Sequence, residues 1–333
     1  MELCVVYGTR PEYLKVYPLL HKLDCRVIRI LQHNDIVELD LKYDFLINVR
    51  NISENRLDSI GSEILLQLGE YIHQFTHILV QGDTSTAFYS ALCAFQNRIK
   101  IIHLEAGMRT YDIFKPYPEE CYRQMISTMT DIHLCPHIAN KRYLEQENVH
   151  GDIHVVGNTI LDLVKSYDLK ISKGNRVLIT FHRRENLQYL NDFINQLKYC
   201  MDENPEKEFV WFLHPNKELQ TAVREYNLKC TFLNPCNHRE FLEYVKDCYC
   251  VLTDSGGIQE ECAFLGKPII VLREYTERDQ IQQPYLFLVK PPFDELKSVF
   301  HLLPDFDLNP CLVYGCGNSV ELIKNILDNT NGK

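Results

Sequence analysis

The chain has 333 residues, of which 45% are apolar and 24% are charged, a composition typical of globular proteins and a length sufficient for two α/β domains. Its formal net charge of −10 argues against nucleic acid as a partner, because proteins that bind nucleic acid usually present a basic surface. No apolar stretch approaches the ~20 residues of a membrane span, and the N-terminal MELCVVYGTR lacks the basic region and cleavage site of a signal peptide, so we expect a cytoplasmic protein without a membrane partner.

Short β-rich apolar runs alternate with segments of helical period along the whole chain, a pattern that predicts βαβ units and parallel sheets. In the first half the expected strands are Leu3–Tyr7, Arg26–Leu31, Ile78–Gln81, Ile101–Leu104, Ile132–Cys135 and Ile153–Val156. In the second half they are Arg176–Phe181, Phe209–Leu213, Cys230–Leu233, Cys250–Thr253, Ile269–Leu272 and Phe287–Val289. The halves are joined around Ile160–Gly174, and the turn Lys173–Asn175 is the best candidate for a hinge.

The sequence therefore predicts an α/β fold with two Rossmann-like domains, residues 1–165 and 166–317. The final stretch, Asn318–Leu327, has helical spacing and by its pattern alone could belong to either domain. Ligands of open parallel sheets bind beyond the carboxyl ends of the strands. Five of the expected strands are followed by motifs rich in polar and charged residues, namely GTRPE, QGDTST, HLEAG, FHRREN and TDSGG. We expect these strand ends to meet in one crevice.

The segment Asp254–Glu261 follows an apolar strand and opens an expected helix. Ser255 is expected to cap this helix, while Gly256 and Gly257 would let backbone N–H groups approach an anion closely. A plain turn between a strand and a helix is the alternative interpretation.

Cations at other strand ends favour the anion site. Arg10 and Lys15 lie in GTRPEYLK, and His182 lies in FHRREN. A guanidinium at a strand end can bind phosphate through two hydrogen bonds, and Lys15 is expected about a turn and a half into the following helix. Each of them alone could be a solvated surface charge, but the positions of Arg10 and His182 favour a diphosphate ligand.

Three carboxylates are candidates for acid–base chemistry: Asp83 in QGDTST, Glu105 in HLEAGMR and Glu119 in KPYPEE. Asp83 and Glu105 follow apolar strands, where a buried carboxylate is costly unless it is paired or functional. Asp83 could instead cap a helix, and Glu119 could be an acidic residue placed favourably in a helix's first turn after Pro118. Two carboxylates on opposite sides of a sugar could act as general acid and base.

Thirteen cysteines raise the question of disulfides or zinc. Their number is odd, no Cys-x-x-Cys occurs, and the closest pairs, Cys248/Cys250 and Cys311/Cys316, lack the spacing of structural zinc sites. Histidine pairs with i,i+4 spacing occur without a His-Glu-x-x-His motif. We expect reduced, structural cysteines and no metal, and we expect the lone Trp211 to lie in the core.

Taken together, the motifs resemble those of the non-hydrolysing UDP-N-acetylglucosamine 2-epimerases from Gly8 to Arg278. In order they are GTRPEYLK, QGDTST, HLEAGMRT, PYPEECYRQ, VVGNT, FHRREN, HPN, LTDSGGIQEE, LGKPIIVLR and TER. Each motif alone is weak evidence, whereas the full series in the correct order is highly specific. The ending Tyr314–Leu327 also resembles the last helix of this family.

The resemblance implies a GT-B-like fold with its active site in the cleft between the two domains. It implies that the second domain binds UDP, that the first surrounds the sugar, and that a C-terminal helix over 318–333 packs back on the first domain. The implied nucleotide-binding residues are Arg10, Phe241, Ser255, Gly256, Gly257, Glu261 and Arg278, and the implied catalytic residues are Lys15, Asp83, Glu105, Glu119 and His182. The family usually forms homodimers and needs neither a nicotinamide cofactor nor a metal.

The implied reaction is the interconversion of C2 epimers of a UDP-N-acetylhexosamine, by default UDP-GlcNAc and UDP-ManNAc. UDP leaves C1 as a proton leaves C2, and re-addition to the glycal intermediate delivers a proton to the other face. A hydrolysing 2-epimerase that releases ManNAc and UDP, a GT-B glycosyltransferase and a non-enzymatic UDP-sugar sensor are the alternatives.

The sequence departs from the family pattern around Gln32-His33, where the motif for an activating second UDP-GlcNAc is incomplete, so we expect that regulation to be weakened or lost. It departs again at Asp279, where a proline normally follows TER, and over Gln280–Pro292. The last of these changes predicts altered substrate selection near the sugar. The incomplete motif around Gln32-His33 favours a related branch of the family that acts on 6-deoxy-L-hexosamine nucleotides.

Overall fold

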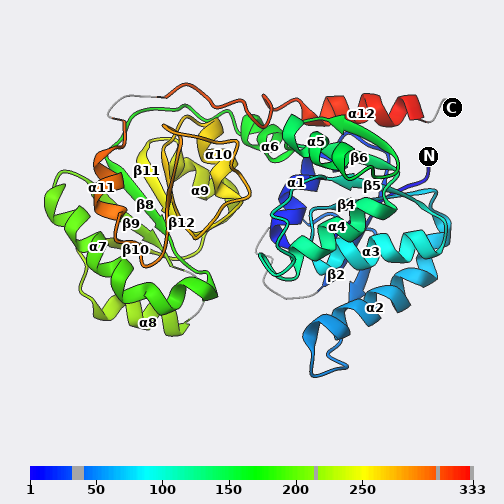
Figure 1. Ribbon diagram of the computed structural model, residues 1–333, viewed down its shortest axis with the longest axis horizontal. Helices are drawn as coiled ribbons and strands as arrows, with labels where there is room; N and C mark the ends of the chain where they lie inside the picture. The colour runs from blue at the N-terminus through cyan, green and yellow to red at the C-terminus, as the bar shows by residue number, and fades with distance from the viewer. Residues whose placement is uncertain (32–40, 214–216, 305–307, 331–333) are drawn as a thin grey trace. The chain divides into compact units, whose positions relative to one another are not determined.

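A computed structural model describes residues 1–31, 41–213, 217–304 and 308–330 (Figure 1). The chain divides into two compact units, Met1–Ser166 with Tyr314–Lys333, and Tyr167–Val313. The change of unit therefore comes at Ser166/Tyr167, and the turn Lys173–Asn175 that we expected as a hinge lies inside the second unit.

Within its described residues, the first unit contains a seven-stranded parallel sheet in the order β3-β2-β1-β4-β5-β6-β7. The strands are β1 (Leu3–Tyr7), β2 (Arg26–Leu31), β3 (Phe45–Asn48), β4 (His77–Gln81), β5 (Lys100–Leu104), β6 (Ile132–Cys135) and β7 (Asp152–Val155). The helices are α1 (Arg10–Leu20), α2 (Arg56–Tyr71), α3 (Ser85–Gln96), α4 (Glu119–Met129), α5 (Ile138–Gln146), α6 (Ile160–Ser166) and α12 (Ser319–Thr330), with a 3-10 turn η1 (Ile72–Gln74). The strand order reverses between β1 and β4, so this point is a topological switch.

The second unit contains a six-stranded parallel sheet among its described residues, in the order β10-β9-β8-β11-β12-β13. The strands are β8 (Arg176–Thr180), β9 (Glu208–Phe212), β10 (Thr231–Leu233), β11 (Cys248–Thr253), β12 (Ile269–Leu272) and β13 (Leu286–Val289). The other elements are η2 (Arg184–Tyr189), α7 (Leu190–Glu203), α8 (Lys217–Glu225), α9 (His238–Val245), α10 (Ile258–Phe264) and α11 (Leu296–His301). Here the switch point lies between β8 and β11.

Apolar residues cover both faces of each sheet, as parallel strands require. In the first unit one face packs against α2, α3 and α4. The other packs against α1 and α12, which contributes Val320, Ile323 and Leu327 (Figure 1). In the second unit Trp211 is 1% exposed inside the core.

The predicted α/β class with two parallel sheets is confirmed, and twelve strands lie within a few residues of their expected positions. The edge strand β3 was not expected, because its four residues, Phe45–Asn48, are too short for a clear pattern. All thirteen cysteines are free thiols. Among the described residues, no helix combines the length and apolar character of a membrane crossing.

Candidate functional site

In the first unit, the turns that follow β1 and β4 are joined by one buried carboxylate. Thr9 caps α1 in a capping box with Glu12, whose Oε2 accepts hydrogen bonds from the Gly8 and Thr9 N–H groups at 2.9 and 2.6 Å. Glu12 Oε1 accepts a 2.5 Å hydrogen bond from the Thr84 hydroxyl, which follows β4. Burial raises the pKa of Glu12, and these hydrogen bonds oppose the rise. Glu12 therefore holds the turn carrying Arg10 to the turn carrying Asp83.

A second carboxylate, Glu105, follows β5 and lies beside α1. Lys15 Nζ donates to Glu105 Oε2 at 2.5 Å, with the two side chains 12% and 6% exposed. The Gln81 side-chain amide donates to the same oxygen. Glu105 has a φ of +67°, a backbone conformation that costs energy for a residue other than glycine and is concentrated at functional sites. Two of the residues predicted from sequence, Lys15 and Glu105, are thus in direct contact.

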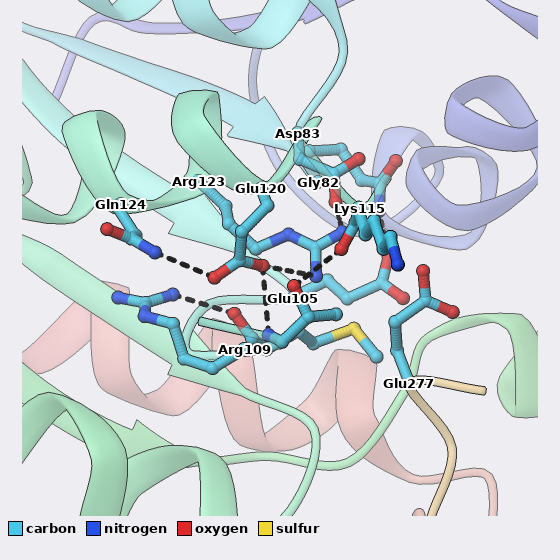
Figure 2. A network of polar contacts seen from close by, with 12 residues as sticks. Gly82, Asp83, Glu105, Arg109, Lys115, Glu120, Arg123, Gln124 and Glu277 are labelled. Atoms are coloured by element: carbon cyan, nitrogen blue, oxygen red, sulfur yellow. Dashed lines mark hydrogen bonds and ion pairs between the residues drawn. The ribbon is translucent and has the colours of Figure 1, made fainter. Parts of the chain in front are cut away.

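Asp83 is bound by a cation that the sequence analysis did not single out. Arg123 of α4 donates through Nη2 to Asp83 Oδ2, and its Nη1 lies 3.1 Å from Glu120 Oε2 (Figure 2). Glu120 accepts hydrogen bonds from the Thr110 and Tyr111 N–H groups, both at 3.0 Å. The start of α4 is thereby joined both to Asp83 and to the loop that follows Glu105.

The structure shows which residue caps the helix after Asp83 and where Glu119 lies in its own helix. Thr84 caps α3, its hydroxyl accepting the Ala87 N–H at 3.1 Å, so Asp83 is not the cap. Glu119 is the first residue of α4 and half-buried, which is the acidic first-turn placement that we considered. A role for Glu119 in chemistry stays a prediction.

In the second unit, Asp254 connects the two strand ends at the switch point. Its Oδ2 accepts the N–H groups of His182 and Arg183, both at 2.8 Å, and its Oδ1 lies 3.1 Å from His182 Nδ1. Burial acts to raise the pKa of Asp254, but the hydrogen bond and charge of His182 outweigh it and hold the pKa below its ordinary value. His182 is partly exposed, with 35% of its side chain accessible. Asp254 thus fixes His182 with its side chain still open to solvent.

The expected cap of α10 by Ser255 is wrong. The helix begins at Ile258 with Gly257 as its N-cap, and no side chain caps it. Ser255 instead donates its N–H to the Thr253 hydroxyl at 2.9 Å and accepts at its carbonyl from Gln259 at 3.0 Å. The helix begins three residues after Ser255, so the Ser255 side chain is not at the capping position.

Guanidinium groups border the turn that contains Gly256. A Cβ added to Gly256 would lie 3.5 Å from Arg273 Nη1 and 3.9 Å from Arg278 Nη1. Arg278 is 9% exposed and donates from Nε to Glu260 Oε1 at 2.9 Å. The predicted residue Arg278 therefore lies next to the predicted glycine, together with Arg273, which we did not predict. Two cations beside a glycine turn suit an anionic ligand.

The remaining predicted residues of this unit lie on α9 and α10. Phe241 is 8% exposed, with its ring centroid 5.1 Å from that of Phe212. Glu261 is 5% exposed, and its Oε2 lies 3.2 Å from His238 Nε2. Both predicted residues are largely buried.

Several charged residues were missed although they stand inside the quoted motifs. Arg109 of HLEAGMRT binds Glu147 through two hydrogen bonds of 2.7 and 2.8 Å, and Arg123 lies in PYPEECYRQ. On a sequence an arginine is most often a surface charge, so only the motif context could have indicated burial.

The motifs Gln32-His33 and HPN fall outside the described residues. Among the described residues, no group of three or more His, Cys, Asp or Glu side chains is arranged to hold a metal ion.

Comparison with known proteins gives consistent matches. A family model described as UDP-N-acetylglucosamine 2-epimerase matches residues 21–328. A Campylobacter jejuni protein named UDP-N-acetylglucosamine 2-epimerase is 34% identical over 318 residues, covering 84% of this chain and 83% of that protein. A Bacillus subtilis protein of the same name is 32% identical over 307 residues, covering 84% and 80%. The crystal structure of UDP-GlcNAc 2-epimerase from Neisseria meningitidis bound to UDP-GlcNAc has a TM-score of 0.90 at 28% identity and covers 99% of this chain and 100% of that chain.

Proposed function

The chain belongs to the UDP-N-acetylglucosamine 2-epimerase family, and from this premise we propose that it is a non-hydrolysing enzyme that reversibly epimerises C2 of a UDP-N-acetylhexosamine. The default pair is UDP-GlcNAc and UDP-ManNAc. The observation that carries the proposal is the set of paired carboxylates at the strand ends of the first unit, Glu105 with Lys15 and Asp83 with Arg123.

The second unit is the proposed UDP-binding domain. Its turn Ser255–Gly257 would receive the diphosphate, with Arg278 and the newly identified Arg273 supplying positive charge beside it. Glu261 would accept hydrogen bonds from the ribose, and Phe241 would lie at the uracil. Arg10 of the first unit completes the proposed set for the nucleotide.

The reaction that we propose begins with cleavage of the C1–O bond. UDP leaves with the bonding electron pair while a carboxylate takes the proton from C2, which forms a C1–C2 double bond in a 2-acetamidoglycal. Re-addition of UDP to C1 with delivery of a proton to the other face of C2 gives the epimer. Atoms and charge balance without a redox cofactor, and cations near the diphosphate stabilise the departing group.

Proton transfer in this scheme belongs to Asp83, Glu105 and Glu119 as a set. Each of two carboxylates has a cation beside it, Lys15 at Glu105 and Arg123 at Asp83. A positioned carboxylate can take a proton from the substrate as a general base. His182, fixed through Asp254, is the proposed partner on the nucleotide side of the reacting carbon.

Product analysis by proton NMR tests the proposal against its two enzymatic alternatives. Incubation with UDP-GlcNAc alone is expected to give UDP-ManNAc with no accumulation of free UDP. Stoichiometric release of ManNAc and UDP would instead identify a hydrolysing 2-epimerase. Consumption that requires an added acceptor sugar would identify a glycosyltransferase. The 6-deoxy-L-hexosamine nucleotides form a parallel arm, because the motif for an activating second UDP-GlcNAc is incomplete around Gln32-His33.

We also propose that the enzyme is cytoplasmic, and that it acts as a homodimer, as the family resemblance implies. Light scattering of the purified protein is expected to give twice the mass of the chain. A monomeric mass under conditions of full activity would exclude the homodimer as the working form.

A further inference from the structure

We propose that His238 is a positioning residue that aims the Glu261 carboxylate at the ribose of the bound nucleotide, and so determines preference for ribonucleotides over deoxynucleotides. This inference rests on the proposed function, because it takes UDP as the ligand of the second unit. It adds to that function a residue that none of the sequence motifs marked.

The first observation is the placement of Glu261. Glu261 is 5% exposed on α10, and His238 Nε2 lies 3.2 Å from its Oε2. Among the described residues, this is the one ion pair that the carboxylate makes. A carboxylate can accept about four hydrogen bonds, so Glu261 retains acceptor capacity that a pair of vicinal hydroxyls would use.

The second observation is that His238 is itself held on its far side. The Tyr167 hydroxyl lies 3.0 Å from His238 Nδ1, and Arg239 stacks over the Tyr167 ring at 5.4 Å. Nε2 faces the Glu261 carboxylate at 3.2 Å, and neither His238 Nε2 nor Glu261 Oε2 has a hydrogen-bond partner among the described residues. The other nitrogen, Nδ1, shares a hydrogen bond with the tyrosine hydroxyl. Tyr167, His238 and Glu261 thus form a chain of contacts that ends at the carboxylate.

The third observation is the geometry of α9. His238 is its first residue, fixed by a capping box in which Asn237 Oδ1 accepts from the Glu240 N–H at 2.9 Å and Glu240 Oε2 accepts from the Asn237 N–H at 3.1 Å. Phe241, proposed to lie at the uracil, follows three residues later and therefore faces the same side of the helix. One rigid helical turn thus presents both the proposed base contact and the residue that aims the ribose contact.

Calorimetric titration of the full chain with UDP and with 2′,3′-dideoxy-UDP tests the inference. Wild type is expected to bind UDP roughly ten- to hundredfold more tightly than the dideoxy nucleotide, because each hydrogen bond to a charged group contributes substantially. His238→Leu is expected to abolish this ratio by weakening UDP alone. His238→Gln, whose amide can donate to Glu261, is expected to restore most of it.

His301 provides the matched control. It pairs with Glu203 at 2.9 Å in the same unit, but its side chain is 52% exposed on α11. His301→Leu is expected to leave the nucleotide ratio unchanged. If His238→Leu fails to fold, Tyr167→Phe removes only the hydroxyl at the end of the chain, and a several-fold fall in the ratio is expected.

The outcomes separate the inference from its premise. The role of His238 is overturned if His238→Leu keeps the preference for UDP over the dideoxy nucleotide while Glu261→Gln abolishes it. Where His238→Leu does not fold, Tyr167→Phe is compared with Glu261→Gln in the same way. Either result leaves the proposed function intact. A wild-type protein that binds no UDP overturns both. Loss of the ratio in His238→Leu, with recovery in His238→Gln and no change in His301→Leu, supports the inference.

Discussion

At the scale of single residues, the site in each unit depends on buried charges whose partners come from a different element. Glu12 of α1 binds Thr84 after β4, Lys15 of α1 binds Glu105 after β5, and Arg123 of α4 binds Asp83. Removing one partner of such a pair leaves a desolvated charge, which is more costly than losing a surface contact. The positions of these side chains are therefore strongly determined by their partners.

The first prediction concerns Asp83 and Glu105. Asp83→Asn and Glu105→Gln preserve side-chain volume but remove the base, so turnover should fall about 10²- to 10⁴-fold. The dissociation constant of UDP should change little, because the nucleotide is assigned to the second unit. Steady-state kinetics and calorimetry provide the two readouts. Glu145→Gln, at a side chain 52% exposed on α5, is the matched control, and turnover above a tenth of wild type in both site variants would remove these residues from the chemistry.

The second prediction concerns His103, which is fully buried and whose Nε2 lies 2.7 Å from the Gly82 carbonyl. Burial lowers the pKa of His103 to about 3 from the ordinary 6.5. The folded protein therefore excludes a proton that the unfolded chain takes up below 6.5. The stability that depends on neutral His103 is complete above pH 6.5 and is lost as the pH falls from 6.5 towards about 3.

Urea unfolding at several pH values measures this effect. In His103→Gln, whose amide can still donate to the Gly82 carbonyl, the slope of unfolding free energy against pH should be smaller by up to about 1.4 kcal/mol per pH unit. Burial also lowers the pKa of His133, so part of the slope should persist. Parallel profiles for wild type and His103→Gln between pH 4 and pH 6 would contradict the assignment.

The sequence motifs named most of the candidate site residues. They did not reveal the residues that pair with them. Asp83, Glu105 and His182 were expected from their strand ends, and Lys15 from the helix that follows the first strand. Arg123 was not, because an arginine on an amphipathic helix carries no sequence mark that separates a buried ion pair from a solvated charge.

At the scale of elements, the functional turns lie where each sheet reverses its strand order. The turns after β1 and β4 meet in the first unit, and those after β8 and β11 meet in the second. The position of these turns at the carboxyl ends of parallel strands was predicted from the alternation of strands and helices, whereas the order of the strands in each sheet was not. The cap of α10 could not, because the helix begins three residues after Ser255 and the start of a helix is poorly determined by pattern.

The third prediction concerns the C-terminal helix α12. Asp162 of α6 accepts the N–H groups of Ser319 and Val320 at 3.1 and 3.0 Å, and so caps α12 from a distant part of the chain. Asp162→Ala should destabilise the first unit by about 1–2 kcal/mol. Amide hydrogen exchange should accelerate in α12 specifically. Asp328→Ala, at an exposed position of the same helix, is the control, and equal effects of the two variants would exclude the capping role.

The fourth prediction concerns Gly174, which lies in the turn Lys173–Asn175 that the sequence favours as a hinge. A Cβ at this position would lie 1.7 Å from the Asp247 carbonyl oxygen, so the glycine allows two backbone segments to touch. Gly174→Ala should therefore destabilise the second unit by several kcal/mol, beyond the roughly 1 kcal/mol typical of single substitutions. Gly257→Ala has open space around its Cβ and should be much milder. A Gly174→Ala variant with the same melting temperature as wild type would contradict the close packing.

At the scale of the whole molecule, two units with the same architecture divide the proposed work. One carries paired carboxylates and the other a glycine turn bordered by arginines. Periodicity of the sequence was enough to predict two parallel sheets, because central strands such as β1, β4 and β12 are buried on both faces and read as continuous apolar runs. The edge strand β3 was not predicted. The change of unit at Ser166/Tyr167 lies one residue after the expected boundary between residues 165 and 166, and several residues before the turn Lys173–Asn175 that we expected as the hinge.

The central claim is that C2 loses its proton while UDP departs and returns. Mass spectrometry and proton NMR of UDP-GlcNAc incubated with the enzyme in deuterated water, without added cofactor, test it most directly. The account predicts UDP-ManNAc carrying one deuterium at C2, deuterium entering C2 of the remaining UDP-GlcNAc, and no free UDP accumulating. UDP-ManNAc that retains protium at C2, or deuterated ManNAc released together with UDP, would contradict it.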